Sequence, residues 1–71
     1  MASVSWSTIE PYVQQAFEVQ GRVERADVID LAYADNASDD VVDAIDAIGS
    51  RVFQRPEDVS TFLTGQNAIS A

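Results

Sequence analysis

Carboxylates are the most abundant reactive groups in this sequence, which contains 12 Asp and Glu residues but no His and no Cys. General acid–base catalysis needs a group that titrates near the working pH, and His fills this role most often. Nucleophilic catalysis by a Ser needs an activating base, and the sequence offers no evident candidate. We therefore expect that the chain is not an enzyme and uses no cofactor.

Four Asp residues are close enough in sequence to be weighed as ligands of one Ca²⁺ ion, namely Asp35, Asp39, Asp40 and Asp43. An EF-hand loop also needs a Gly at its sharp turn and a Glu as its last ligand, and neither stands at the required spacing. The sequence therefore favours an acidic face in solvent and predicts no metal site.

Ser38 is the residue through which the chain would act if it were an acyl carrier, a class of small, acidic, helical proteins. Such carriers hold phosphopantetheine on a Ser in an Asp-Ser-Leu turn that opens a helix, whereas Ser38 is followed by Asp39 and Asp40. We expect no phosphopantetheine at this position.

The charge balance restricts the partners that the chain can bind. It has 4 Lys and Arg residues against 12 acidic ones, which gives a formal net charge of −8. Nucleic acids and anionic membranes are bound by clustered Lys and Arg, so we expect direct binding to neither. The helices expected on either side of Asn36 resemble a helix-turn-helix, but the second would present Asp39, Asp43 and Asp46 to phosphates with the wrong sign. An acidic surface of this kind favours a basic partner.

A helix is predicted in the first third of the chain by apolar residues at helical spacing: Ile9, Tyr12, Val13, Ala16 and Phe17. Its start is open between two choices, Ser7 as the N-cap of a capping box with Glu10, or Pro11 as the first helical residue. We place its end at residues 19–20, with Gly21 adopting a positive φ.

Three more helices are predicted from apolar stripes and capping residues: about 25–35, 39–48 and 56–65. Ser38 is a favourable N-cap for the second of these, and Pro56 suits the first position of the last. Short extended segments at 22–24 and 50–55 are each expected to precede a helix.

These elements predict an all-α fold, a single small domain of four short helices with a short extended segment before the last helix. Residues 1–6 are expected to form an N-terminal lead, residues 7–65 the helical domain and residues 66–71 a flexible tail. The expected core consists of these residues: Ile9, Val13, Phe17, Val28, Leu31, Ala32, Val41, Ile45, Ile48, Phe53, Val59, Phe62 and Leu63.

Residues 28–63 contain four stretches in a characteristic order: Leu31-Ala32, residues 36–45 (Asn-Ala-Ser-Asp-Asp-Val-Val-Asp-Ala-Ile), Arg51-Val52-Phe53 and Pro56-Glu57-Asp58-Val59. This order resembles a family of short bacterial helical domains of unknown function. Its members show a Leu-x-x-x-Ala helix, an Asn-Gly-Ala-Asp-Asp-like turn, Arg-x-Tyr and Ser-Pro-x-Asp-Val. The chain departs from that pattern at Ala37, Phe53 and Arg55. Because the pattern consists of helix caps and core positions, the resemblance implies a helical fold and no catalytic residues.

The function that the sequence favours is a non-catalytic protein–protein interaction or regulatory module. We expect its binding surface to be an exposed aromatic patch, formed by Trp6 with Tyr12 or Tyr33. The partner would be another protein, which the sequence does not identify.

Two alternatives remain open. One is an acidic nucleic-acid mimic, which would inhibit a DNA-binding protein through Asp39, Asp43 and Asp46. The other is a self-associating structural domain, whose exposed patch is the interface of a homodimer. No stretch approaches the roughly 20 apolar residues of a membrane span, and no signal peptide is evident, so the expected location is cytoplasmic.

Overall fold

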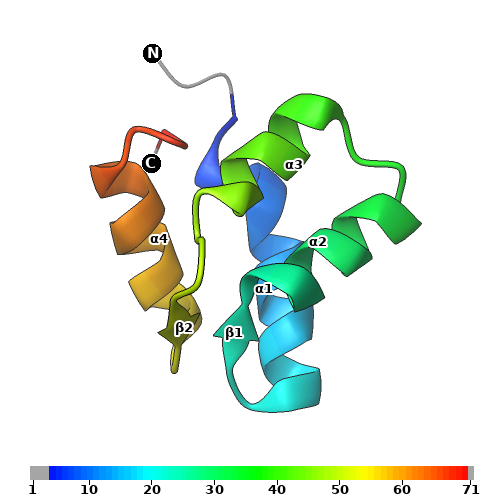
Figure 1. Ribbon diagram of the computed structural model, residues 1–71, viewed down its shortest axis with the longest axis vertical. Coiled ribbons are helices and arrows are strands. Elements are labelled where there is room, and N and C mark those ends of the chain that lie inside the picture. The colour runs from blue at the N-terminus through cyan, green and yellow to red at the C-terminus, as the bar shows by residue number, and fades with distance from the viewer. Residues whose placement is uncertain (1–3, 71) are drawn as a thin grey trace.

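The computed structural model describes residues 4–70, which form four helices and a two-stranded sheet (Figure 1). The elements follow in this order: α1 (Trp6–Gln20), β1 (Val23–Glu24), α2 (Arg25–Ala34), α3 (Asp39–Asp46), β2 (Val52–Phe53) and α4 (Pro56–Gly65). The predicted small helical domain with an extended segment before the last helix is confirmed. Residues 1–3 and 71, which belong to the predicted lead and tail, lie outside the described residues.

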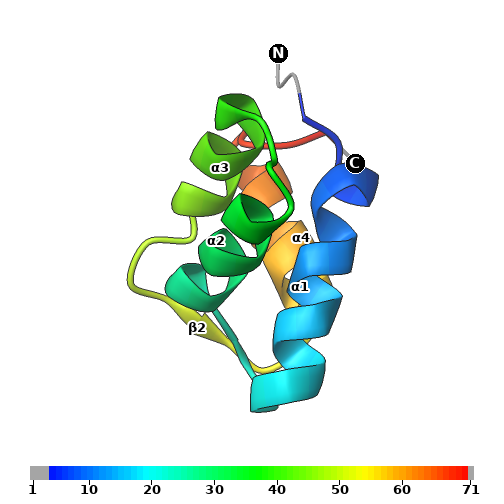
Figure 2. The same cartoon turned by 90° about the vertical axis from the view of Figure 1, so that its right-hand side faces the viewer.

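The longest helix, α1, lies at the centre of the helix packing. It contacts each of the other three helices, and α2 packs in turn against both α1 and α3. Figure 2 shows α1 and α2 next to each other, with α3 beyond α2. The surfaces of α1 and α2 therefore face each other along part of their lengths.

All six elements pack around one apolar core. Its largest fully buried side chains are aliphatic: Ile9, Val13, Val23, Val28, Ile45, Ile48, Val59 and Leu63. Four residues predicted for the core are only half-buried and pack against it from outside: Phe17, Leu31, Phe53 and Phe62. A chain of 71 residues encloses little volume, so its bulkiest side chains remain at the edge of the core.

The two extended segments pair with each other, although they are separated by α2 and α3 in the sequence. β1 and β2 are antiparallel, with Val23 opposite Phe53 and Glu24 opposite Val52. Val23, which the sequence places in a simple link, is fully buried. The pairing depends on contacts distant in sequence, so local patterns predict the extended segments but not their association.

Local signals correctly predict most helix ends. Gly21 ends α1 with a φ of 72°, and Asn36 follows α2 with a φ of 56°. Ser38 caps α3, because its side-chain oxygen accepts a 3.4 Å hydrogen bond from a backbone N–H in the first turn. The end of α3 differs from the prediction, because the helix stops at Asp46 and a turn continues through Gly49 to Ser50.

The first helix begins earlier than either predicted choice. α1 starts at Trp6 with Ser5 as its N-cap, so neither the predicted cap at Ser7 nor the predicted start at Pro11 is right. Pro11 instead lies inside the helix. The backbone N–H of Trp6 has no partner within the helix, and it donates to the carbonyl oxygen of Ser70 at 2.9 Å. This acceptor is remote in sequence, which explains why local signals misplace the start.

Residues 66–70 are part of the fold, in contrast to the flexible tail predicted for residues 66–71, whose last residue lies outside the described residues. Ile69 is 3% exposed, and Val4 from the predicted N-terminal lead is also buried. Ser5 and Ser70 form an isolated parallel bridge, in which the N–H of Ser70 donates to the carbonyl of Val4 at 2.9 Å. The two chain ends thus complete the core, because each supplies one buried aliphatic side chain.

Candidate functional site

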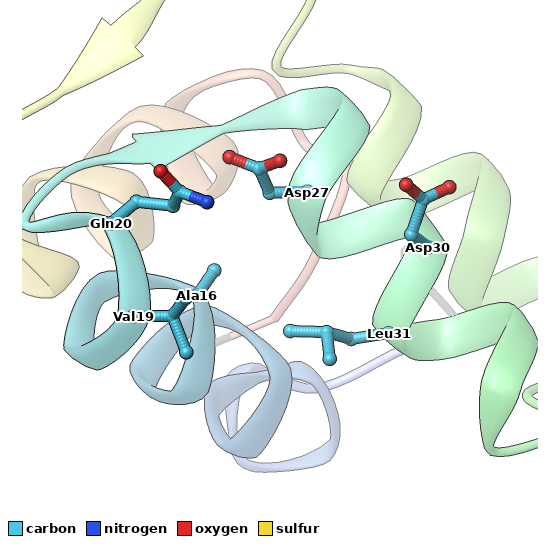
Figure 3. Close-up of a pocket in the computed structure, with 6 residues that line it drawn as sticks. All are labelled: Ala16, Val19, Gln20, Asp27, Asp30 and Leu31. Carbon is cyan, nitrogen blue, oxygen red and sulfur yellow. The ribbon is translucent and has the colours of Figure 1, made fainter.

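Two open hollows lie between α1 and α2 and adjoin at Leu31. The smaller has a volume of about 170 Å³ (Figure 3) and is lined by Ala16, Val19, Gln20, Asp27, Asp30 and Leu31. The larger, of about 380 Å³, is lined by Pro11, Tyr12, Gln15, Leu31, Ala34 and Asp35. Because they share Leu31, we describe the two hollows together as the α1–α2 groove.

Apolar side chains form part of the lining of the smaller hollow. Ala16 is buried, Leu31 is half-buried, and Val19 near the end of α1 is 73% exposed. Figure 3 shows Leu31 projecting from α2 toward α1. Because Val19 and Leu31 line the same hollow, their apolar surface is gathered at one place, as at interaction sites, instead of being scattered over the protein.

Carboxylates also line the two hollows. Asp27 and Asp30 on α2 line the smaller hollow, and Asp35 lines the larger one. No basic side chain lines either hollow, and within residues 4–70 none of these three carboxylates takes part in an ion pair. The groove therefore combines apolar surface with uncompensated negative charge.

The Arg side chains are engaged outside the groove. Each of the four Arg side chains contacts a group outside the groove: Arg22 with Glu24, Arg25 with Asp46, Arg51 with the ring of Phe62, and Arg55 with Asp58. The negative charge of the groove thus remains available to a partner.

One hydrogen bond crosses the groove. The hydroxyl of Tyr12 on α1 donates to Oδ2 of Asp35, the residue that directly follows α2, at 2.7 Å. This hydrogen bond raises the pKa of Tyr12, and desolvation and the negative charge of Asp35 act in the same direction. The phenol therefore keeps its proton over the neutral range and links the two walls of the larger hollow.

The structure places the three predicted aromatic residues in different surroundings. Trp6 is half-buried against the core and lines neither hollow. Tyr33 is 62% exposed, but two positions along a helix from Leu31 correspond to about 200° of rotation, so Tyr33 points away from the groove. Of the three, Tyr12 lies in the groove.

The predicted acidic residues Asp39, Asp43 and Asp46 are exposed on α3. Oδ1 of Asp46 accepts a 2.7 Å hydrogen bond from the guanidinium of Arg25 on α2. This acidic face therefore has part of its charge neutralised by an ion pair, whereas the carboxylates of the groove have no such partner in the described part of the chain.

Most of the groove is absent from the sequence-based prediction. Val19, Asp27 and Asp30 are not predicted as site residues, and Leu31 is assigned to the core. The available signal is the breadth of the apolar face of α2, which is wide enough to contact two neighbouring helices. How far α1 and α2 diverge is set by tertiary packing, so the sequence does not show that Leu31 borders open hollows.

The volumes of the two hollows bear on the class of ligand that the groove can bind. Pockets for small molecules typically enclose about 300–1,000 Å³ and bury most of their ligand. The hollow of about 170 Å³ falls below this range and the one of about 380 Å³ lies within it, but both hollows are open to solvent. Within residues 4–70, no three His, Cys, Asp or Glu side chains gather closely enough to hold a metal ion. No helix in the same part of the chain is long and apolar enough to cross a bilayer. The open, adjoining hollows suit the side chains of a larger partner.

The resemblance to short bacterial helical domains stays a prediction, and the inferred function rests on the groove itself. No protein-family model matches this chain, and neither a curated protein nor a solved structure does so.

Proposed function

We propose that this domain is a non-catalytic protein–protein interaction or regulatory module, which binds another protein in the α1–α2 groove. The observation that supports the proposal is a surface on which Val19 and Leu31 adjoin carboxylates that have no ion-pair partner within residues 4–70. Apolar centres with polar margins are typical of protein interfaces. The cytoplasm, expected from the sequence, is the location we propose for this activity.

Recognition of a protein segment suits the shape of this surface. The groove runs between two helices, and its hollows are small, open and adjoining. Side chains that project from one face of a partner segment would fill such hollows one by one, as in the binding of a helix in a groove. A compact small molecule would leave most of its own surface in water.

The experiment that tests this function is capture from a lysate of the host cell with the tagged domain and two matched variants. Val19→Ser removes apolar surface from the groove, and Val52→Ser makes the same change on β2, outside the groove. Val19 is 73% exposed and Val52 is 47% exposed, so both variants should fold. We expect a stoichiometric partner that wild type and Val52→Ser retain and that Val19→Ser loses on the order of fivefold.

Two results of this capture would contradict the proposal. One is the absence of a stoichiometric partner for the wild-type domain. The other is a partner that both Val→Ser variants retain equally well, because recognition would then take place on a different surface.

A triple variant separates this function from the acidic nucleic-acid mimic. Asp39→Asn, Asp43→Asn and Asp46→Asn together remove three of the four exposed carboxylates of α3, and none of the three lines the groove. A mimic would lose its DNA-binding partner, whereas a module that binds through the groove keeps its partner. Sedimentation of the wild-type domain alone addresses the homodimer, for which the expected result is a monomer.

A further inference from the structure

From the groove, and on the basis of the proposed binding function, we infer the chemistry of its partner. The occupant is a short amphipathic helix of another protein, which places apolar side chains against Val19 and Leu31. Its Lys or Arg side chains lie beside Asp27, Asp30 and Asp35. Three features of the groove point to this occupant: its charge, the position of Asp35 and its length.

The charge of the groove is complementary to a basic segment. Asp27 and Asp30 lie three positions apart on α2, so their carboxylates are neighbours that repel each other. Figure 3 shows both side chains on the α2 side of the smaller hollow, which no basic residue lines. A cation from a partner would relieve this repulsion, and the net charge of −8 on the whole chain would steer it toward the domain.

Asp35 lies where a carboxylate is electrostatically unfavourable. The C-terminal end of a helix carries partial negative charge, and Asp35 directly follows α2, which has no basic residue in its last turn. Among the side-chain hydrogen bonds of residues 4–70, Asp35 accepts one, from the neutral hydroxyl of Tyr12. A Lys or Arg of the partner would offset both the carboxylate and the helix end.

The length of the groove matches a short helix. Its lining residues on α1 recur at every turn: Pro11 and Tyr12, then Gln15 and Ala16, then Val19 and Gln20. A repeat of four residues over two intervals corresponds to about 12 Å along α1. A partner helix of about three turns would therefore cover the groove, with apolar side chains at i, i+4 and i+7 directed into it.

Anionic occupants are disfavoured by the same charges. A second copy of this chain would bring another net charge of −8 to the contact, and a nucleic acid would bring its phosphates. Both would face the carboxylates of the groove without a compensating cation. A second copy of the chain is therefore the alternative that the experiment distinguishes.

The test is a titration of the ¹⁵N-labelled domain with synthetic helical peptides of about four turns, followed through backbone amide shifts. The first peptide carries Leu at i, i+4 and i+7 with Lys at the flanking positions, and the second replaces every Lys with Gln. We expect the Lys peptide to shift amides of α1 and α2 that border the groove. The Gln peptide should bind on the order of tenfold more weakly, and so should the Lys peptide at high salt.

Two matched double variants test whether the charge-dependent binding of the Lys peptide takes place at the groove. Asp27→Asn with Asp30→Asn removes two charges from the groove, and Asp39→Asn with Asp43→Asn removes two from α3. Each pair includes one carboxylate from the first turn of its helix, so the expected effects on folding are similar. We expect on the order of tenfold weaker binding for the groove pair and less than about twofold for the α3 pair.

Three outcomes would overturn the inference: equal weakening by both double variants, equal binding of the Lys and Gln peptides, or amide shifts at the groove that depend on the concentration of the domain alone. The last outcome would identify a second copy as the occupant. If no peptide binds but a captured partner still requires Val19, the proposed function stands and this inference fails. If neither the peptide nor a lysate protein needs Val19, both fail.

Discussion

Tyr12 on α1 and Asp35 at the end of α2 join the two walls of the α1–α2 groove through a hydrogen bond of 2.7 Å. Within residues 4–70 it is the one side-chain hydrogen bond between these two helices. Its donor is neutral, and its acceptor lies at the negative end of α2. The bond therefore affects both the stability of the fold and its dependence on pH.

Replacing Tyr12 with Phe removes the donor and keeps the ring that packs against the core. We expect a lower free energy of unfolding, because Asp35 loses its partner at the C-terminal end of α2. The measurement is urea denaturation, in which the midpoint should fall while the slope stays unchanged. Tyr33→Phe is the control, since the Tyr33 side chain is 62% exposed. Equal midpoints for Tyr12→Phe and wild type would show that the bond contributes nothing.

The stability of the domain should fall at alkaline pH because of the same bond. The hydrogen bond to Asp35 raises the pKa of Tyr12 in the folded protein above its ordinary value of about 10. Its contribution to stability is complete below that value and is lost as the pH rises through the folded pKa, because the unfolded chain releases its proton first. Urea midpoints measured from about pH 8 to pH 11 should fall more steeply for wild type than for Tyr12→Phe. An equal dependence of the two urea midpoints on pH would contradict the attribution of this loss of stability to the Tyr12–Asp35 hydrogen bond.

Replacing Ile69 with Ala tests the role of the C-terminal segment. Ile69 is 3% exposed, so the substitution leaves a cavity in the core and should lower the free energy of unfolding by about 2–5 kcal/mol. Such a loss is a large part of the stability expected of so short a chain. Thermal unfolding followed by circular dichroism measures it, with the exposed Gln66→Ala as control. An unchanged midpoint for Ile69→Ala would restore the sequence-based prediction of a flexible tail.

Two glycines should respond in opposite directions to substitution by Ala. Gly21 has a φ of 72°, which strains any side chain, so Gly21→Ala should destabilise the domain by about 1 kcal/mol. Gly65 lies at the end of α4 without a positive φ, and a Cβ there meets open space. Gly65→Ala should stabilise by about 0.4–1 kcal/mol. Urea denaturation measures the midpoint of each variant. A shift of both midpoints in the same direction would contradict the backbone conformations assigned to Gly21 and Gly65.

The sequence predicts the fold wherever a local signal decides the structure. Gly21 and Ser38 each adopt the capping role that their chemistry favours. The prediction is wrong where a segment distant in sequence decides the local structure. The N–H of Trp6 finds its acceptor at Ser70, so α1 begins before the predicted caps, and the supposed tail becomes part of the core.

The sequence predicts less of the candidate site than of the fold. Tyr12 is the one aromatic residue of the predicted patch that lines the groove, and helical periodicity assigned Leu31 to the interior. Apolar spacing shows which face of a helix is buried, but not how closely the neighbouring helix covers it. Val19 and Asp30 become candidates only when the positions of α1 and α2 are known.

The parallel bridge at the chain ends has a mechanical consequence. Because the two paired segments run in the same direction, the chain enters beside Val4 and leaves beyond Ser70 at opposite ends of the bridge. A force that stretches the domain by its ends would load both hydrogen bonds of the bridge together, in shear, instead of opening them one after the other. We expect the two hydrogen bonds of the bridge to bear the tension first. Once they break, Val4 and Ile69 should become exposed to water before the helices unfold.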